Sequence, residues 1–292
     1  MHRFNVCYFA GVSCRRLLPA ALWLIAANSG QASVTGNLPP AYEAPHTRIR
    51  LFTAGPVGEG ADARAMVGIE IVMEPGWKTY WRTPGEGIAP SFSWDESLNL
   101  KDVRVLWPAP VRFADGEGSS SIGYKERVVL PVAVTPEDPT RPVSLNLAVA
   151  YGVCKDICMP VEAELSLDLD MPVRKSDRDE LLRTLAQVPR RQEEGALCPH
   201  RFLSARLVSL EEKPALRVET AYETGVQQRD LMVEAPQEAG IAAPMLDAAS
   251  PPGKAAYLFS LEPEGVPLIQ SRPLTFTMVS DQGSCESMAL VK

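Results

Sequence analysis

Histidine is scarce in this sequence, and that scarcity removes several kinds of catalytic and metal site. Only three of the 292 residues are histidine, and two of them, His46 and His200, lie beyond the N-terminal region. Structural zinc needs four ligands, usually Cys or His, and neither histidine is close in sequence to Cys154 or Cys158. The remaining residues assemble no catalytic triad and no glycine-rich phosphate loop. We therefore expect no metal and no cofactor.

Long apolar runs and clusters of positive charge are also missing. The one extended apolar run covers residues 17–27, whereas a membrane-spanning helix needs about 20 apolar residues. The formal net charge is −7, and no Lys/Arg cluster stands out beyond the N-terminal region. We expect such a chain not to insert into a membrane and not to bind nucleic acid or anionic lipid.

The N-terminus is typical of a cleavable export signal. Arg15 and Arg16 precede the apolar run over residues 17–27, and small residues at 30–32 offer a cleavage site. We expect residues 1–32 to be a signal peptide and the mature protein to lie in the periplasm. The arginine pair leaves the twin-arginine export route open as well.

Cleavage determines how many cysteines the mature chain keeps. Cys7 and Cys14 would leave with the signal peptide. The four that remain are Cys154, Cys158, Cys198 and Cys285. An even number in an exported protein suggests two disulfides, and four cysteines allow three pairings.

The apolar pattern of the first half predicts short strands. The sequence contains 26 prolines, mostly between short apolar runs, which favours strands and turns over long helices. Residues 65–73 alternate in polarity with a period of two, as a half-buried strand does. Further strands are expected at 91–94, 103–107, 127–134, 143–153 and 161–169. We expect loops at the aromatic segment 77–85, which can either pack or form a docking face, and at the small, polar segment 115–121. These strands predict an immunoglobulin-like β-sandwich.

A helix and a second set of strands follow. Ser176 can cap a helix, apolar residues then recur at helical spacing, and Pro189 is expected to end it. Strands are expected again at 202–210, 216–222, 231–234, 256–261, 274–279 and 287–291. The predicted fold is all-β, with two immunoglobulin-like β-sandwich domains at residues 40–172 and 197–292. A short helical linker at residues 173–196 would join them.

Cys154 and Cys158 bound the connection between two neighbouring strands. Apolar residues alternate into Cys154 and away from Cys158, so a hairpin can bring the two within the Cα separation of about 5.5–6 Å that a disulfide needs. Closing so short a ring contributes about 2 kcal/mol in the loop-entropy model, against about 4.6 kcal/mol for a ring from Cys198 to Cys285. We therefore interpret Cys154/Cys158 as a working redox pair and Cys198/Cys285 as a structural disulfide.

Other roles for the short pair stay open at this point. It can be a passive hairpin disulfide, which would make the protein a non-redox binding module. Two thiolates and the thioether of Met159 would also suit Cu(I), giving a copper-binding protein. Covalent haem needs C-x-x-C-H, which does not match this spacing. A thioredoxin-fold copper chaperone is disfavoured because no βαβ pattern surrounds the pair.

Four segments together resemble a known family. They are Pro75–Trp81, Trp107–Phe113, Gly123–Val132 and Tyr151–Pro160. The set is similar to the N-terminal periplasmic domain of DsbD-type thiol:disulfide interchange proteins, in the variant seen in ScsB. The resemblance is good over residues 45–170 and looser in the second half.

The resemblance implies an immunoglobulin-like fold and a cysteine pair that carries electrons. The pair would accept them from a membrane-embedded thiol donor and pass them to oxidised periplasmic thioredoxin-like proteins. Cys158 would form the mixed disulfides and Cys154 would resolve them, in processes such as cytochrome c biogenesis or copper tolerance.

Two departures from the family pattern stand out. The chain ends at Lys292 without the membrane and thioredoxin-like domains, so a separate protein is expected to supply electrons. The family's cap loop can carry an aromatic residue that shields the cysteines, whereas residues 115–121 have none. Phe113 or Tyr124 would have to take that role.

Overall fold

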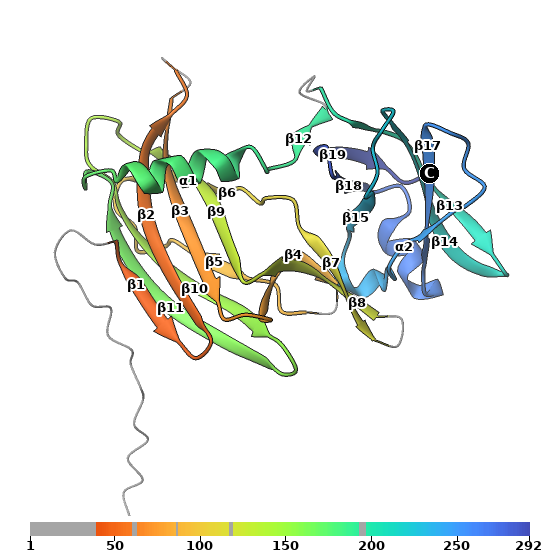
Figure 1. Cartoon of the computed structure of the whole chain (residues 1–292), viewed down its shortest axis with the longest axis horizontal. Coiled ribbons are helices and arrows are strands. Elements are labelled where there is room, and N and C mark those ends of the chain that lie inside the picture. Colours follow the sequence, from red (N-terminus) through yellow and green to blue (C-terminus); the bar gives the residue numbers. More distant parts are fainter. Residues whose placement is uncertain (1–38, 60–62, 86, 117–118, 193–196) are drawn as a thin grey trace, which may run out of the picture. The chain divides into compact units, whose positions relative to one another are not determined.

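The described part of the chain is built from four β-sheets. The computed structural model describes residues 39–59, 63–85, 87–116, 119–192 and 197–292 (Figure 1). The expected signal peptide at residues 1–32, with Cys7 and Cys14, lies outside the described residues. Within the described ranges, no helix is both long enough and apolar enough to cross a bilayer.

Two facing sheets form the first β-sandwich. One has the order β1-β2-β3-β9-β6 and the other the order β11-β10-β4-β8-β7, with β5 paired to β10. The strands of the first sheet are β1 (Ala41–Ala44), β2 (Thr47–Val57), β3 (Arg64–Met73), β9 (Arg127–Pro136) and β6 (Leu100–Val105). Those of the second are β11 (Cys158–Asp168), β10 (Ser144–Cys154), β4 (Lys78–Gly85), β8 (Ser119–Lys125), β7 (Val111–Gly116) and β5 (Ser91–Ser93).

The period-two pattern explains how these sheets share a core. Successive side chains of a strand point to opposite faces, so every second residue can be buried between the sheets. Ile69 and Ile71 of β3 and Leu147 and Tyr151 of β10 belong to one buried apolar cluster. The predicted immunoglobulin-like β-sandwich is confirmed.

Two segments expected to be loops are strands. Residues 78–85 form β4, and Trp77, Tyr80 and Trp81 are buried rather than displayed on a docking face. Residues 111–116 and 119–125 form the paired strands β7 and β8. The prediction of a loop over residues 115–121 was wrong for 115–116 and 119–121, because these residues belong to two strands that pair with each other. Residues 117 and 118 lie outside the described part.

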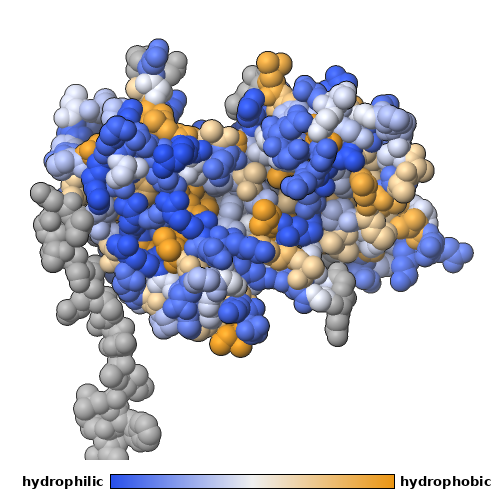
Figure 2. All heavy atoms as spheres, in the orientation of Figure 1, coloured by the Kyte–Doolittle hydropathy of each residue, from blue (hydrophilic) through white to orange (hydrophobic). Residues whose placement is uncertain are grey.

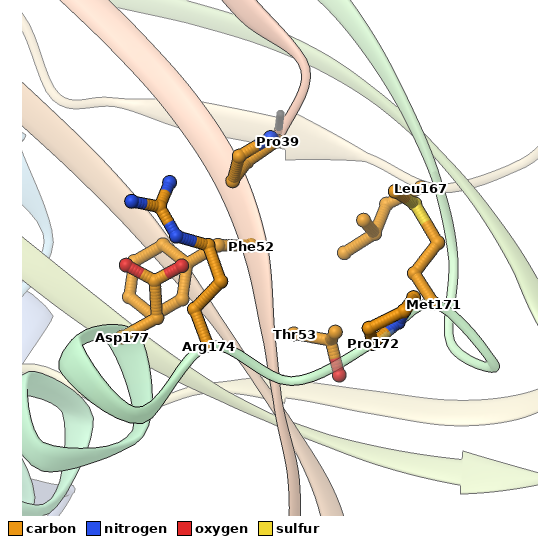
Figure 3. A pocket seen from close by; sticks show the side chains of 8 residues that line it. All are labelled: Pro39, Phe52, Thr53, Leu167, Met171, Pro172, Arg174 and Asp177. Carbon is orange, nitrogen blue, oxygen red and sulfur yellow. The ribbon is translucent and has the colours of Figure 1, made fainter. Parts of the chain in front are cut away.

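The predicted helix exists but is shorter and packs on the sandwich. Helix α1 spans Lys175–Leu185 and ends at Ala186, so Pro189 does not terminate it. Leu181 of α1 is fully buried in a cluster with Phe52 of β2. Arg50 of β2 donates to Asp177 at 3.0 Å. Figure 3 shows Asp177, at the start of the helix, and Phe52 of β2 among the side chains that line a small pocket.

Two four-stranded sheets follow the helix. Their orders are β12-β19-β18-β15 and β13-β14-β17-β16. The first contains β12 (Arg190–Arg191), β19 (Gly283–Leu290), β18 (Pro273–Ser280) and β15 (Asp230–Glu234), and the second β13 (His200–Leu210), β14 (Lys213–Tyr222), β17 (Lys254–Ser260) and β16 (Met245–Leu246). Short helical turns lie at η3 (Gln237–Ala239), η4 (Pro263–Gly265) and α2 (Val266–Ile269). The domain boundaries at residues 40–172, 173–196 and 197–292 stay a prediction.

Candidate redox site

The β10–β11 hairpin holds Cys154 and Cys158 directly opposite each other. The strands pair in register from Ser144↔Asp168 to Cys154↔Cys158 without a bulge. The three residues between the cysteines form the turn, in which the Lys155 amide donates to the Ile157 carbonyl at 3.1 Å. The two Cα atoms are 4.2 Å apart, and the sulfurs form a disulfide.

The two faces of the hairpin have different roles. Tyr151 and Val153 point into the core, so Gly152 and Cys154 lie on the outer face of the sheet. Met159 is the register partner of Val153 and packs against the same core. Its thioether is therefore on the opposite face from the cysteines and does not complete the Cu(I) ligand set considered above. Among the described residues, no group of three or more His, Cys, Asp or Glu could hold a metal.

The two cysteines differ in exposure. Cys154 is 1% exposed, whereas Cys158 is an exposed residue. The turn beside them is also exposed, and the Ile157 side chain is 65% exposed. A partner approaching the hairpin would reach Cys158 first.

Tyr80 of β4 covers the outer face beside the disulfide. Its hydroxyl lies 3.2 Å from the Sγ of Cys158. The ring needs Gly152 beneath it, because a Cβ there would lie 3.3 Å from the ring and 2.9 Å from the Cβ of Ile88. Above the ring passes Gly87, where a Cβ would lie only 2.4 Å from it. The tyrosine is thus held between the sheet and the segment after β4.

A lysine-centred cluster continues this face away from the cysteines. Lys78 is the register partner of Cys154, and its ammonium donates to Asp115 of β7 and, at 2.9 Å, to the Ser121 hydroxyl of β8. The ammonium lies 5.0 Å from the ring centre of Phe113.

These contacts set the protonation of two members of the cluster. Burial opposes ionisation of Asp115, but hydrogen bonds from Lys78 and Ser121 outweigh it and hold the pKa of the carboxyl below its ordinary value. Burial first, and then the negative charge of Asp115, raise the pKa of Tyr80. The phenol therefore stays protonated at neutral pH and can donate to the sulfur of Cys158.

The two aromatic residues considered as shields lie on different faces. Phe113 is on the cysteine face, since its register partner Ser121 contacts Lys78. Tyr124 is buried in the sandwich core and donates to the Pro108 carbonyl at 2.8 Å. Phe113 is buried beneath the ammonium of Lys78. The hydroxyl that reaches Cys158 belongs to Tyr80, which lies in the aromatic segment 77–85 but was not predicted to shield the cysteines.

The second cysteine pair is placed quite differently. Cys198 and Cys285 form a disulfide across 87 residues, with Cα atoms 6.0 Å apart. Cys285 of β19 is fully buried in the apolar core of the C-terminal sheets, and Cys198 is half-buried against it.

Comparison with known proteins assigns the first sandwich to a family. Residues 53–170 match the family model described as thiol:disulfide interchange protein DsbD, N-terminal. Residues 53–170 are a DsbD-type N-terminal domain. This DsbD-type domain contains the hairpin, Tyr80 and the Lys78 cluster, and it associates the site with thiol:disulfide interchange at the level of the family.

A solved structure shares the fold beyond the DsbD-type domain. The crystal structure of the N-terminal periplasmic domain of ScsB from Proteus mirabilis matches with a TM-score of 0.68 and 23% sequence identity. The match covers 85% of this chain and 94% of that one, so the common fold includes the sheets that follow α1. No curated protein sequence matches the chain significantly.

Proposed function

We propose that the protein relays reducing equivalents in the periplasm through Cys154 and Cys158. The observation that carries this proposal is the pairing of an exposed Cys158 with a buried Cys154 at the end of a hairpin, inside a DsbD-type domain. An exchanging disulfide needs one sulfur that a partner can reach and a second that completes the reaction.

The exchange proceeds in two steps. In the reduced protein, the Cys158 thiolate attacks one sulfur of a partner's disulfide. A bond forms between Cys158 and that sulfur, and the partner's other sulfur leaves as a thiolate and takes up a proton. The Cys154 thiolate then attacks the Sγ of Cys158, which restores the Cys154–Cys158 bond and releases the second partner sulfur. Two electrons pass to the partner.

Each residue of the site has a part in this sequence. The hydroxyl of Tyr80, 3.2 Å from the Sγ of Cys158, stabilises negative charge on that sulfur. The direct register of the two cysteines places Cys154 within bonding distance of Cys158. Cys198 and Cys285 take no part, since they close a long loop in the other core.

The partners follow from the chemistry of the family. A separate thiol protein in the membrane would reduce the Cys154–Cys158 disulfide, and thioredoxin-like proteins with oxidised cysteines would receive the electrons. Location in the periplasm is supported by the periplasmic origin of the similar ScsB domain and by the export signal expected at residues 1–32.

Equilibration with glutathione tests the proposal on the mature chain. The fraction of Cys154–Cys158 disulfide is measured by alkylation across a series of glutathione ratios. We expect half of the Cys154–Cys158 disulfide to be reduced at about −200 mV, while Cys198–Cys285 stays oxidised. A hairpin disulfide that opens only well below about −300 mV would overturn the proposal, because such a bond is structural.

Trapping distinguishes the two cysteines. Cys154→Ala is expected to accumulate mixed disulfides with thioredoxin-like proteins through Cys158. The matched variant Cys158→Ala is expected to accumulate few, because Cys154 is buried. Equal trapping by the two variants would contradict the assigned roles.

A further inference from the structure

Cys154 is the cysteine that needs help to ionise. It is 1% exposed, and burial of a thiol disfavours the charged thiolate and raises its pKa. In the proposed exchange, however, Cys154 must act as a thiolate to resolve the mixed disulfide on Cys158. A positive charge on the same face would make that possible.

Lys78 is placed to supply this charge. It is the register partner of Cys154 across β4 and β10, so both side chains leave the sheet on the same face. The Cβ atoms of such antiparallel partners are about 4.5–5.5 Å apart. The Lys78 side chain is only 15% exposed, which weakens the screening of its charge by water.

The surroundings of Lys78 fix the ammonium on this face. It is held by Asp115 and Ser121, and it lies 5.9 Å from the ring centre of Tyr80. The far end of that ring reaches the Sγ of Cys158. The ammonium, the phenol and both sulfurs therefore share one continuous patch of the sheet.

The other charged groups near the cysteines are less well placed. Lys155 follows Cys154, but its side chain extends over Gly76. Lys125 on β8 lies one strand beyond Lys78, is exposed, and sits 5.4 Å from the Phe113 ring. Two exposed acids also lie on the hairpin, Asp156 in the turn and Glu162 on β11, and Glu126 accepts a hydrogen bond from the Gly76 amide.

We propose that Lys78 stabilises the thiolate of Cys154 and that Asp115 limits this stabilisation by pairing with Lys78. The proposal rests on the redox function assigned to Cys154 and Cys158. A thiolate stabilised too strongly is a poorer nucleophile, because nucleophilicity falls as the thiol pKa falls. The Lys78–Asp115 ion pair therefore keeps the Cys154 thiolate reactive. Lys78 acts on this thiolate through its charge and does not bond to the reacting sulfur.

Two variants with opposite expected effects test this role. The ionisation of Cys154 is followed by the ultraviolet absorbance of its thiolate in full-length mature Cys158→Ala protein, with Cys198–Cys285 intact. The same protein carrying Cys154→Ala as well gives the tyrosine background. Lys78→Gln is expected to raise the pKa of Cys154 by about one unit, and Asp115→Asn to lower it by a similar amount.

Matched controls separate this effect from damage to the fold. Lys78→Arg keeps the charge and is expected to keep the thiol pKa near that of the parent. Lys125→Gln removes a lysine charge one strand further away and is expected to shift the pKa much less. Shifts in the same direction for Lys78→Gln and Asp115→Asn, or an equal shift for Lys125→Gln, would overturn the proposal.

The titration also separates this inference from the proposed function. It needs no partner and no exchange, so the expected shifts can occur even if the hairpin disulfide proves inert to glutathione. Conversely, normal exchange with no shift in the Lys78→Gln titration refutes only the role of Lys78. If Lys78→Gln does not fold, the direction in which Asp115→Asn shifts the pKa of Cys154 still tests the proposal.

Discussion

Tyr80→Phe removes one hydroxyl from the site and leaves the ring in place. That hydroxyl lies 3.2 Å from the Sγ of Cys158 and can donate to the thiolate. Hydrogen bonds to charged groups contribute about 1.5–3 kcal/mol, and sulfur is a weak acceptor, so the lower end applies. A loss of about 1.4 kcal/mol corresponds to about one pKa unit. We therefore expect the pKa of the Cys158 thiol to rise by about one unit.

The pH dependence of Cys158 alkylation measures this shift. In Cys154→Ala protein, the rate with iodoacetamide is expected to reach its midpoint about one pH unit higher when Tyr80 is replaced by Phe. Below both midpoints the reaction is then about tenfold slower, because only the thiolate reacts. The matched control is Tyr124→Phe, which removes a hydroxyl from the core of the same sheet.

Two outcomes would refute the reasoning. An unchanged midpoint in Tyr80→Phe would mean that the phenol does not stabilise the thiolate. An equal shift in Tyr124→Phe would mean that the effect arises from general loosening of the sheet. Unfolding in urea provides the check on stability, and little change is expected for Tyr80→Phe because the ring remains packed.

Three further outcomes are expected. Gly152→Val should destabilise the protein by about 1–3 kcal/mol in urea, because its side chain would clash with Ile88 and crowd the Tyr80 ring. Val at the exposed Ala148 of the same strand face should have little effect. Glu70 is buried, but hydrogen bonds from Arg50 and Arg127 hold the pKa of its carboxyl below the ordinary value of 4.5. The stabilisation of the folded protein by the charged carboxylate is therefore fully present above pH 4.5, and it is lost as the pH falls through the lowered pKa. Glu70→Gln should therefore flatten the loss of stability in acid, and an acid profile identical to that of the wild type would count against this. Replacing Cys198 and Cys285 by Ala should lower the free energy of unfolding by about 4.6 kcal/mol, whereas replacing Cys154 and Cys158 by Ala should lower it by about 2 kcal/mol. Equal losses for the two pairs would contradict the loop-entropy argument.

The strand pattern of the sequence predicted much of the fold, but not the strands with irregular composition. Residues 65–73 alternate cleanly and form β3. β4 was missed because Pro75-Gly76 and a cluster of aromatic residues suggest a turn, although Lys78 and Tyr80 share one face and Thr79 and Trp81 the other. β2 was missed because Gly55 and Pro56 near its end interrupt the apolar pattern.

The site could be predicted only in part for a related reason. Alternation toward Cys154 and away from Cys158 is local information, and it indicates the hairpin directly. The pairing of β4 with β10 joins residues far apart in the sequence, such as Lys78 and Cys154, and no local pattern reveals it. Met159 lies on the same parity as Val161, and this local pattern predicts that its side chain packs against the core, as it does.

The direct register of the two cysteines has a consequence for recognition. The backbone ladder that holds them continues without a bulge down to Ser144↔Asp168 and does not depend on the sulfur–sulfur bond. Opening that bond leaves the hairpin supported by ten other residue pairs and by the core beneath it. Oxidised and reduced molecules would then present nearly the same outline, so a donor and an acceptor would have to distinguish them by the chemistry of the sulfurs rather than by shape.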